Sequence, residues 1–122
     1  MKQIFGTSRI EWEHLEDADQ LEKIKEESAD NDILIFKYST RCSVSGMALD
    51  RLDRSWNGDE MKQVKTYFLD LISYRNISNA IEDIFNVRHE SPQVLLIRNG
   101  ESIYNSSHMG ISYPAIKDLT SK

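Results

Sequence analysis

The sequence contains one cysteine, two prolines and five glycines in 122 residues. A single cysteine cannot form an intramolecular disulfide, so nothing here demands an oxidising compartment. The low Gly and Pro content and a hydrophobic fraction of 39% exclude a fibrous or disordered chain. No apolar run approaches the roughly 20 residues of a membrane helix, and the N-terminus becomes acidic too early for a signal peptide. We therefore expect a cytoplasmic protein with one domain over residues 1–122, a typical domain length.

Positive charge is scarce near the N-terminus. Residues 11–32 contain ten acidic and two basic side chains, in a chain whose net charge is −5. A nucleic-acid complex would need Lys and Arg side chains to meet the phosphates, so this segment argues against nucleic-acid binding. The simplest interpretation of the acidic segment is a solvated helix face. We expect neither nucleic acid nor membrane among the partners.

The spacing of apolar residues divides the chain into alternating helices and strands. Helical spacing predicts helices at about 17–28, 44–56, 77–85 and 112–119, the last with Ser112 as its N-cap. Continuous apolar runs predict strands at 33–36, 67–69 and 94–97, and such runs are typical of strands covered on both faces. Asn99-Gly100 is the favoured pair for a two-residue hairpin turn, and it leads into a more polar edge strand at 101–106.

This order of elements predicts an α/β fold. Strand–helix–strand crossovers put the first strands parallel, with right-handed connections, and the hairpin makes the last strand antiparallel. The expected architecture is therefore thioredoxin-like: a mixed four-stranded sheet flanked by helices, with room for one short extra strand near Ile10–Trp12.

The sole cysteine lies where a strand ends and a helix begins. Cys42 follows Ser39-Thr40-Arg41 and precedes a helix that starts near Ser43. Unpaired N–H groups and the helix dipole stabilise an anion at this position, and Arg41 adds a cation nearby. Cys42 is therefore the candidate nucleophile, acting as a thiolate. An inert, buried cysteine is the alternative interpretation.

Ser45 stands three residues after Cys42, where a dithiol oxidoreductase has its second cysteine. A serine hydroxyl can donate a hydrogen bond to a thiolate, but it cannot resolve a disulfide. A catalytic Cys42 would therefore have to act as a single thiol. The alternative is that Ser45 is an ordinary serine in the first turn of a helix.

Ser91-Pro92 directly precedes the third apolar strand. X–Pro bonds are cis in only about 5–6% of cases in folded proteins, so the residues alone favour trans. The thioredoxin architecture reverses this expectation, because it places a cis proline opposite the active-site helix. The backbone N–H and C=O of the residue before that proline can bind an extended, thiol-bearing ligand.

Two of the three histidines lie near this region. His108 follows the edge strand and is a candidate ligand or base, with a surface loop residue as the alternative. His89 precedes Ser91-Pro92 and would order that loop. The spacing of these histidines and Cys42 matches no zinc pattern, so we expect no metal.

Three segments of the sequence resemble the YtxJ-type monothiol bacilliredoxins. They are residues 39–45, residues 89–100 and the pair Ser107-His108, and the similarity extends from about residue 12 to residue 119. The His-Glu-Ser-Pro-Gln stretch and its spacing from the cysteine are the most specific part. The resemblance implies a thioredoxin-like fold and removal of bacillithiol from S-thiolated cytoplasmic proteins. It also implies that Cys42 is the nucleophile and Pro92 the active-site proline.

One position departs from the family pattern. The family usually has proline directly after the cysteine, in a Thr-Cys-Pro-Ile-Ser pattern, and this chain has Ser43. Proline suits the first helical turn because it needs no donor and its φ is preset. Serine, unlike proline, has a backbone N–H that could donate to the sulfur. The departure therefore concerns the redox properties of the cysteine more than its role as the nucleophile.

The sequence thus predicts a monothiol thiol–disulfide oxidoreductase of the bacilliredoxin or glutaredoxin-like type. The Cys42 thiolate would attack a protein–small-thiol mixed disulfide and retain the small thiol, and a second small thiol would regenerate it. The expected partners are S-thiolated proteins and a low-molecular-weight thiol co-substrate, bacillithiol by resemblance, with no bound cofactor. The alternative is a non-catalytic thioredoxin-like module that binds a peptide near Pro92. The remaining candidate site residues are Thr40, Arg41, Ser43 and Ser45 in support of the thiolate, and Ser91 and His108 in substrate binding.

Overall fold

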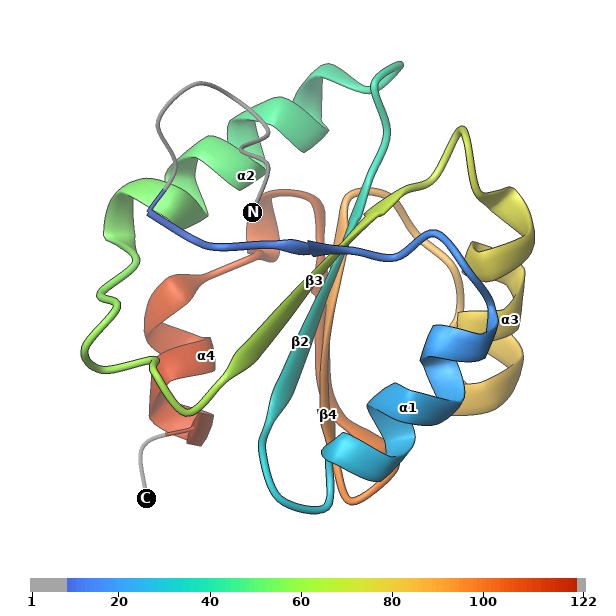
Figure 1. The fold of residues 1–122 in the computed structure, drawn as a ribbon. Coiled ribbons are helices and arrows are strands. Elements are labelled where there is room, and N and C mark those ends of the chain that lie inside the picture. Colours follow the sequence, from blue (N-terminus) through green and yellow to red (C-terminus); the bar gives the residue numbers. More distant parts are fainter. Residues whose placement is uncertain (1–8, 121–122) are drawn as a thin grey trace.

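Strands and helices alternate along the chain in the computed structural model, which describes residues 9–120 (Figure 1). The strands are β1 (Glu13–His14), β2 (Ile33–Tyr38), β3 (Lys65–Asp70), β4 (Gln93–Arg98) and β5 (Glu101–Ser107). The helices are α1 (Asp19–Glu27), α2 (Ser43–Ser55), α3 (Arg75–Phe85) and α4 (Tyr113–Thr120), with a single 3₁₀ turn, η1 (His108–Gly110), before α4. None of these helices is long and apolar enough to cross a membrane.

The strands form one mixed sheet in the order β1-β3-β2-β4-β5. The predicted thioredoxin-like sheet flanked by helices is confirmed, including the short extra strand. That strand is β1 at Glu13–His14, slightly later than the predicted Ile10–Trp12. Ile10 and Trp12 are 3% and 2% exposed, because their side chains enter the core before the chain reaches the edge of β3.

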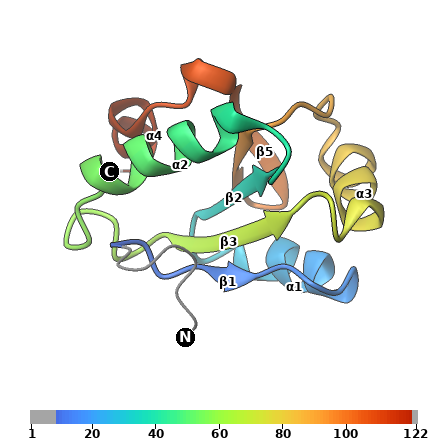
Figure 2. The ribbon, with the colours of Figure 1, turned by 90° about the horizontal axis from the view of Figure 1, so that it is seen from above.

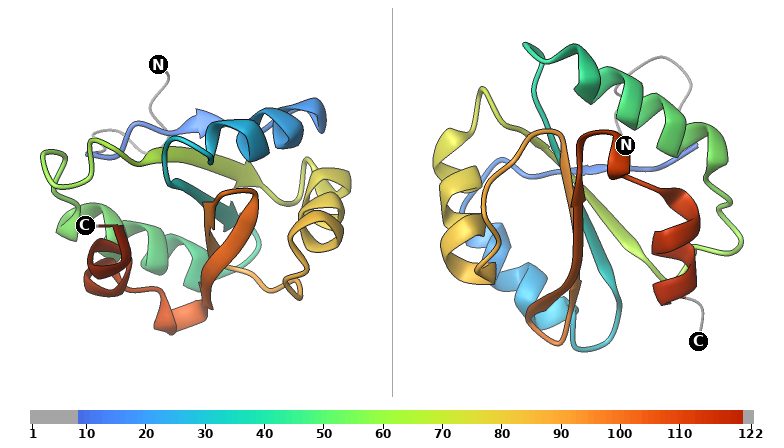
Figure 3. Two further views of the ribbon diagram at one scale, coloured as in Figure 1. Left: turned by 90° about the horizontal axis from the view of Figure 1, so that it is seen from below. Right: turned by 180° about the vertical axis from the view of Figure 1, so that it is seen from behind.

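The direction of β4 differs from the sequence-based expectation. β2 and β3 are parallel as predicted, but β4 is antiparallel to β2. The reason lies in residues 86–92, which bring the chain back from α3 to the end of the sheet where β3 stops (Figure 3). Asp70 at the end of β3 pairs with Tyr38, and Gln93 at the start of β4 pairs with Lys37. The chain therefore re-enters the sheet from the same end and runs in the opposite direction.

Helices cover both faces of the sheet, with α2 and α4 on one face and α1 and α3 on the other (Figure 2). In β2, Leu34 and Phe36 belong to the α2 and α4 core, whereas Ile33 and Ile35 belong to the core on the opposite face. Every residue of β2 is buried, which explains its continuous apolar run. On the α2 face, Trp12 packs edge-on against Phe36 at 5.9 Å between ring centroids.

The β4–β5 hairpin turns as the sequence predicts. Asn99 (φ 53°) and Gly100 (φ 79°) both adopt the left-handed conformations of a two-residue turn. The pairing of the two strands shifts register between Leu96 and Ile97. Tyr104 faces Leu96 and Ser102 faces Ile97, so Ile103 is one extra residue on β5, which is the arrangement of a β-bulge.

Candidate active site

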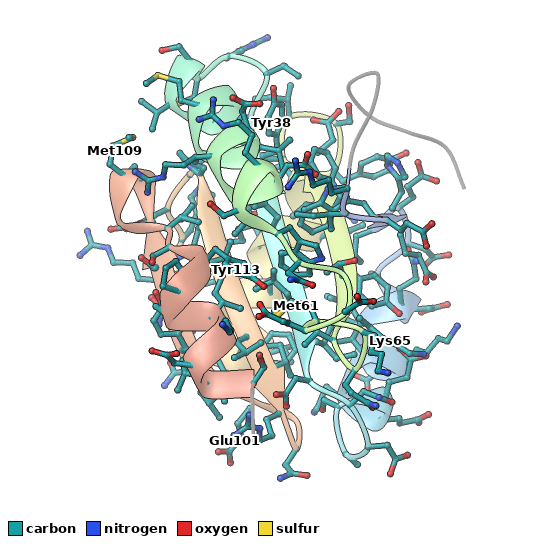
Figure 4. All side chains as sticks on the ribbon, turned by 90° about the vertical axis from the view of Figure 1, so that its left-hand side faces the viewer. Tyr38, Met61, Lys65, Glu101, Met109 and Tyr113 are labelled. Carbon is teal, nitrogen blue, oxygen red and sulfur yellow. The ribbon has the colours of Figure 1, made fainter. Side chains whose placement is uncertain are left out.

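The segment around Cys42 and the segment around Pro92 meet at one end of the sheet. β2 ends at Tyr38 and leads through residues 39–42 into α2. Gln93, the residue after Pro92, pairs with Lys37 on one side and with Ser107 on the other. Tyr38 and Met109 mark this end of the molecule in Figure 4. The structure thus brings together the segments that the sequence analysis selected separately.

Cys42 occupies the N-cap position of α2, a helix of 13 residues. Its backbone is extended (φ −116°, ψ 113°), its amide donates to Ser39 O at 3.1 Å, and its carbonyl accepts from Ser45 N at 3.0 Å. The thiol is free and half-buried. An anion at this position is stabilised by the unpaired N–H groups and the dipole of the helix. Cys42 therefore lies at the junction between a strand and a helix, as predicted from the sequence.

Ser45 is fully buried, and its hydroxyl contacts the backbone of the turn before the helix. Ser39 N donates to Ser45 Oγ at 3.2 Å, and Arg41 N donates to Ser39 Oγ at the same distance. These two hydrogen bonds hold the turn that presents Cys42. Ser45 is therefore hydrogen-bonded to the backbone of the turn that carries Cys42. The three other predicted supporting residues, Thr40, Arg41 and Ser43, are exposed next to Cys42 in the chain.

The Ser91-Pro92 peptide bond is cis, as predicted. Pro92 is buried, and its carbonyl accepts a hydrogen bond from His108 N at 2.9 Å. His108 is exposed and has a left-handed backbone (φ 55°), which is uncommon outside glycine and costs conformational energy. Among residues 9–120, the Ser91 hydroxyl has no hydrogen-bond partner. Ser91, Pro92 and His108 therefore form one connected unit beside the start of β4.

Sequence analysis missed Lys37, which is fully buried at the same end of β2. Its Nζ lies 3.1 Å from His89 Nδ1, and burial lowers the pKa of Lys37 to about 8 despite the attraction of Glu82. Burial and the Lys37 charge lower the pKa of His89. The prediction that His89 orders the loop before Pro92 is consistent with these contacts. The missed signal was periodicity, because Lys37 follows Ile33 and Ile35 at the alternate positions that face the α1 and α3 core.

Two exposed methionines lie at the same end of the molecule. Met47, in α2, is 58% exposed, and Met109, in η1, is 49% exposed. Arg51 of α2 donates hydrogen bonds to the carbonyls of Met109 and Ile111, which fixes η1 against the helix. Methionine side chains are flexible and apolar, and they are common at surfaces that bind varied partners.

The described part of the chain offers no metal centre at this end or elsewhere. Residues 9–120 contain no group of three or more His, Cys, Asp or Glu side chains that could hold a metal ion. The reactive side chain that the structure does place at this end is a half-buried thiol at a helix N-terminus.

Comparisons with known proteins agree with this geometry. The family model described as monothiol bacilliredoxin BrxC matches residues 13–116. A candidate oxidoreductase with a thioredoxin fold is 28% identical, with a TM-score of 0.72, over 86% of this chain and 89% of that protein. The thioredoxin Mala s 13 of Malassezia sympodialis is 16% identical, with a TM-score of 0.72, over 99% of this chain and 100% of that one.

A further thioredoxin, from Fasciola hepatica, is 16% identical with a TM-score of 0.66, over 89% of this chain and 98% of that one. The two thioredoxins show the fold alone, whereas the family match covers both the Cys42 segment and the Pro92 segment. The chain therefore belongs to the monothiol bacilliredoxin BrxC family and is a thiol–disulfide oxidoreductase with a thioredoxin fold.

Proposed function

We propose that the protein removes a small thiol from S-thiolated proteins through a mixed disulfide at Cys42, and that the small thiol is bacillithiol. The observation that carries this proposal is the single, half-buried cysteine at the N-cap of α2. With no second cysteine, an oxidised Cys42 must share its disulfide with another molecule. Membership of the bacilliredoxin family supports bacillithiol as that molecule.

The proposed reaction has two exchange steps. The Cys42 thiolate attacks the small-thiol sulfur of a protein–S–S–R disulfide, a new S–S bond forms, and the old bond breaks with the protein sulfur leaving as a thiolate that takes a proton from water. A second small thiolate then attacks the R sulfur of the Cys42–S–S–R disulfide. This step releases RSSR and returns the Cys42 thiolate, so the protein disulfide is reduced and two small thiols end as one disulfide.

The residues around Cys42 have separate roles in this proposal. Arg41 adds positive charge near the thiolate, while Thr40 and Ser43 line the turn that the substrate reaches. The backbone of Ser91, before the cis proline, binds the extended chain that carries the disulfide. His108, whose amide holds the Pro92 carbonyl, lies where the headgroup of the small thiol would bind.

We further propose that the protein acts in the cytoplasm. The second exchange step needs a pool of reduced small thiol, and reducing pools of this kind are characteristic of that compartment. S-thiolated cytoplasmic proteins and bacillithiol are therefore the proposed partners, with the small thiol as co-substrate and no bound cofactor.

A second candidate function is that of a non-catalytic module that binds a peptide near Pro92. The exposed Met47 and Met109 favour it, because both side chains offer apolar surface to a protein partner beside the site. In the enzyme proposal, the same surface receives the S-thiolated protein. The two functions differ in what they require of Cys42, since a binding module needs no reactive thiol.

Mass spectrometry after incubation with oxidised bacillithiol tests the proposal. We expect one bacillithiol adduct on the wild type and none on Cys42→Ser, with slower adduct formation from oxidised glutathione, which has a different headgroup. Equal rates with the two disulfides would refute bacillithiol as the preferred co-substrate. The absence of any adduct on the wild type would refute the exchange reaction and favour the binding module.

A further inference from the structure

A buried lysine lies beneath residues 88–92, the segment before and including the cis proline, which we call the proline loop. Lys37 in β2 is fully buried on the sheet face covered by α1 and α3. Its Nζ lies 3.1 Å from His89 Nδ1, and Ser78 Oγ of α3 lies 3.3 Å from the same nitrogen. Glu82, one turn further along α3, attracts the Lys37 charge. A buried ammonium is costly to maintain, and the exchange steps described above do not use it.

The chemistry of the two groups sets the direction of this hydrogen bond. An ammonium group can only donate, so His89 Nδ1 is the acceptor and the ring carries its proton on Nε2. Burial lowers the pKa of His89, and the charges of Lys37 and Arg75 lower it further, which keeps the ring neutral near pH 7. A hydrogen bond from a charged donor is roughly twice as strong as a neutral one. Lys37 therefore fixes the orientation of the His89 ring.

The proline loop is also tied to β4 and to the residues that follow β5. Gln93, buried at the start of β4, donates to Arg88 O at 2.9 Å and accepts from Glu90 N at 3.4 Å. Pro92 O accepts from His108 N at 2.9 Å. These contacts hold the two ends of the loop, but none of them joins the loop to β2.

The hydrogen bond from Lys37 to His89 supplies the connection between the loop and β2. β2 is also the strand that leads to Cys42, five residues after Lys37. In addition, Lys37 pairs across the sheet with Gln93, the residue directly after Pro92. One residue of β2 thus contacts the proline loop through its side chain and the start of β4 through its backbone.

We propose that Lys37 is a positioning residue for thiol exchange, which holds the proline loop at a fixed distance from Cys42 through its hydrogen bond to His89. This inference rests on the function proposed above, in which the backbone of Ser91 binds the incoming disulfide. A fixed loop places the substrate sulfur where the Cys42 thiolate can attack it. A loose loop still leaves the thiolate reactive, but it no longer aligns the substrate.

Lys37→Met tests this role, because methionine fills the buried space but cannot donate to His89. Replacing a buried charge by an apolar side chain of similar volume is often neutral or stabilising, so we expect the variant to fold. Amide hydrogen exchange at Glu90 and His108 should become about tenfold faster, the effect of losing one charge-assisted hydrogen bond. The amides between β2 and β3 should keep their protection. Adding Ser78→Ala should loosen the loop further, because Ser78 Oγ is the second group near the His89 nitrogen.

Kinetics separate positioning from a general effect on the protein. In Lys37→Met, the KM for an S-thiolated protein should rise about tenfold with a smaller change in kcat, as expected when a binding contact is misplaced. Alkylation of Cys42 by iodoacetamide, which needs no substrate alignment, should keep its wild-type rate. Lys37→Gln, which retains a neutral donor, should restore part of the loss. Lys62→Met, at an exposed lysine before β3, is the matched control.

Three results would overturn the inference. Unchanged amide exchange at Glu90 and His108 in Lys37→Met would show that Lys37 does not hold the loop. A loosened loop with an unchanged KM would show that holding the loop does not serve exchange. A His89 ring protonated at Nδ1 in the wild type, measured by ¹⁵N NMR, would overturn it whether or not the variant folds. A wild type that transfers no thiol would instead refute the proposed function, and the amide measurements distinguish the two cases because they need no turnover.

Discussion

The two ends of the sheet are held together in different ways (Figure 4). At the end marked by Lys65 and Glu101, charged side chains form direct pairs. Arg98 makes two hydrogen bonds to the Asp32 carboxylate, at 2.8 and 2.7 Å, and donates a third to Leu119 O at 2.8 Å. At the Cys42 end, main-chain groups and hydroxyls hold the turn before α2, and a buried cation, Lys37, faces a neutral ring.

This difference suggests that the far end contributes mainly to the stability of the fold and the Cys42 end mainly to thiol exchange. The bidentate pair between the Arg98 guanidinium and the Asp32 carboxylate ties β4 to the segment before β2 at the far end. The Cys42 end leaves Arg41, Ser43 and His108 exposed, where the proposed substrate would approach. We therefore expect changes at the far end to affect unfolding but not exchange, and changes around Cys42 to affect exchange, whereas the buried Lys37 bears on both.

Removal of the thiol should give the largest effect. In Cys42→Ser, exchange should fall at least about a thousandfold, because no other cysteine can replace the nucleophile. The free energy of unfolding should change by less than about 0.5 kcal/mol, since the side chain is half-buried and the substitution is nearly isosteric. Adduct formation and urea unfolding on the same preparation measure both quantities. Residual exchange above one per cent of the wild type would contradict the assignment of Cys42.

Alkaline pH should reveal the cost of the buried lysine. The pKa of Lys37 is about 8 in the folded chain and 10.5 in a model peptide, with Glu82 and His89 as the facing groups. Between these values the unfolded chain binds more protons, so stability rises with pH. Relative to Lys37→Met, the free energy of unfolding should therefore rise by about 3 kcal/mol from pH 8 to pH 10.5.

Urea unfolding at several pH values measures this difference. Both proteins should carry Cys42→Ser, so that thiol oxidation at high pH does not interfere. Parallel pH profiles for the two proteins would mean that Lys37 keeps an ordinary pKa in the fold.

At the far end we expect a smaller change in stability, and here it is a loss. Arg98→Ala removes two hydrogen bonds to Asp32 and one to Leu119 O, and should cost about 2 kcal/mol of unfolding free energy. Exchange per folded molecule should not change. The matched control is Arg54→Ala, which breaks an exposed pair with Asp50 and should cost less than about 0.5 kcal/mol. A drop in exchange for Arg98→Ala would mean that the two ends are coupled.

The smallest effect is expected from Ser43→Pro, which restores the family pattern. Ser43 is the first residue of α2, where proline needs no donor, and the extended backbone of Cys42 is compatible with a following proline. We expect a gain of about 0.5 kcal/mol in unfolding free energy, because proline restricts the unfolded chain. The exchange rate should change less than tenfold. A larger drop in exchange would show that the Ser43 N–H serves the sulfur.

The parts of the fold that depend on neighbouring residues could be predicted from the sequence. The apolar run from Ile33 predicted a strand buried on both faces, and Asn99-Gly100 predicted the hairpin turn, because both signals are local. The direction of β4 could not be predicted in this way. It depends on how residues 86–92 return across the end of the sheet, which the spacing of apolar residues does not encode.

The site shows the same limit. The position of Cys42 between a strand and a helix was visible in the sequence, and the expected thioredoxin architecture supplied the cis proline. The contact of Ser45 with Ser39 N and that of Lys37 with His89 were missed. The first depends on a side-chain rotamer. The second joins residues 52 positions apart, which become neighbours only when the sheet has formed.

The extra residue in β5 affects the tendency of the protein to aggregate at high concentration. β5 is one of the two edge strands of the sheet, so its far side can accept the strand of another molecule, as in aggregation. The bulge at Ile103 strengthens the local twist and interrupts the regular spacing of backbone donors and acceptors. A twisted, irregular edge is a poor template for a second strand. The bulge should therefore make the β4–β5 hairpin, which ends at Ser107, less prone to pair with a strand of a second molecule.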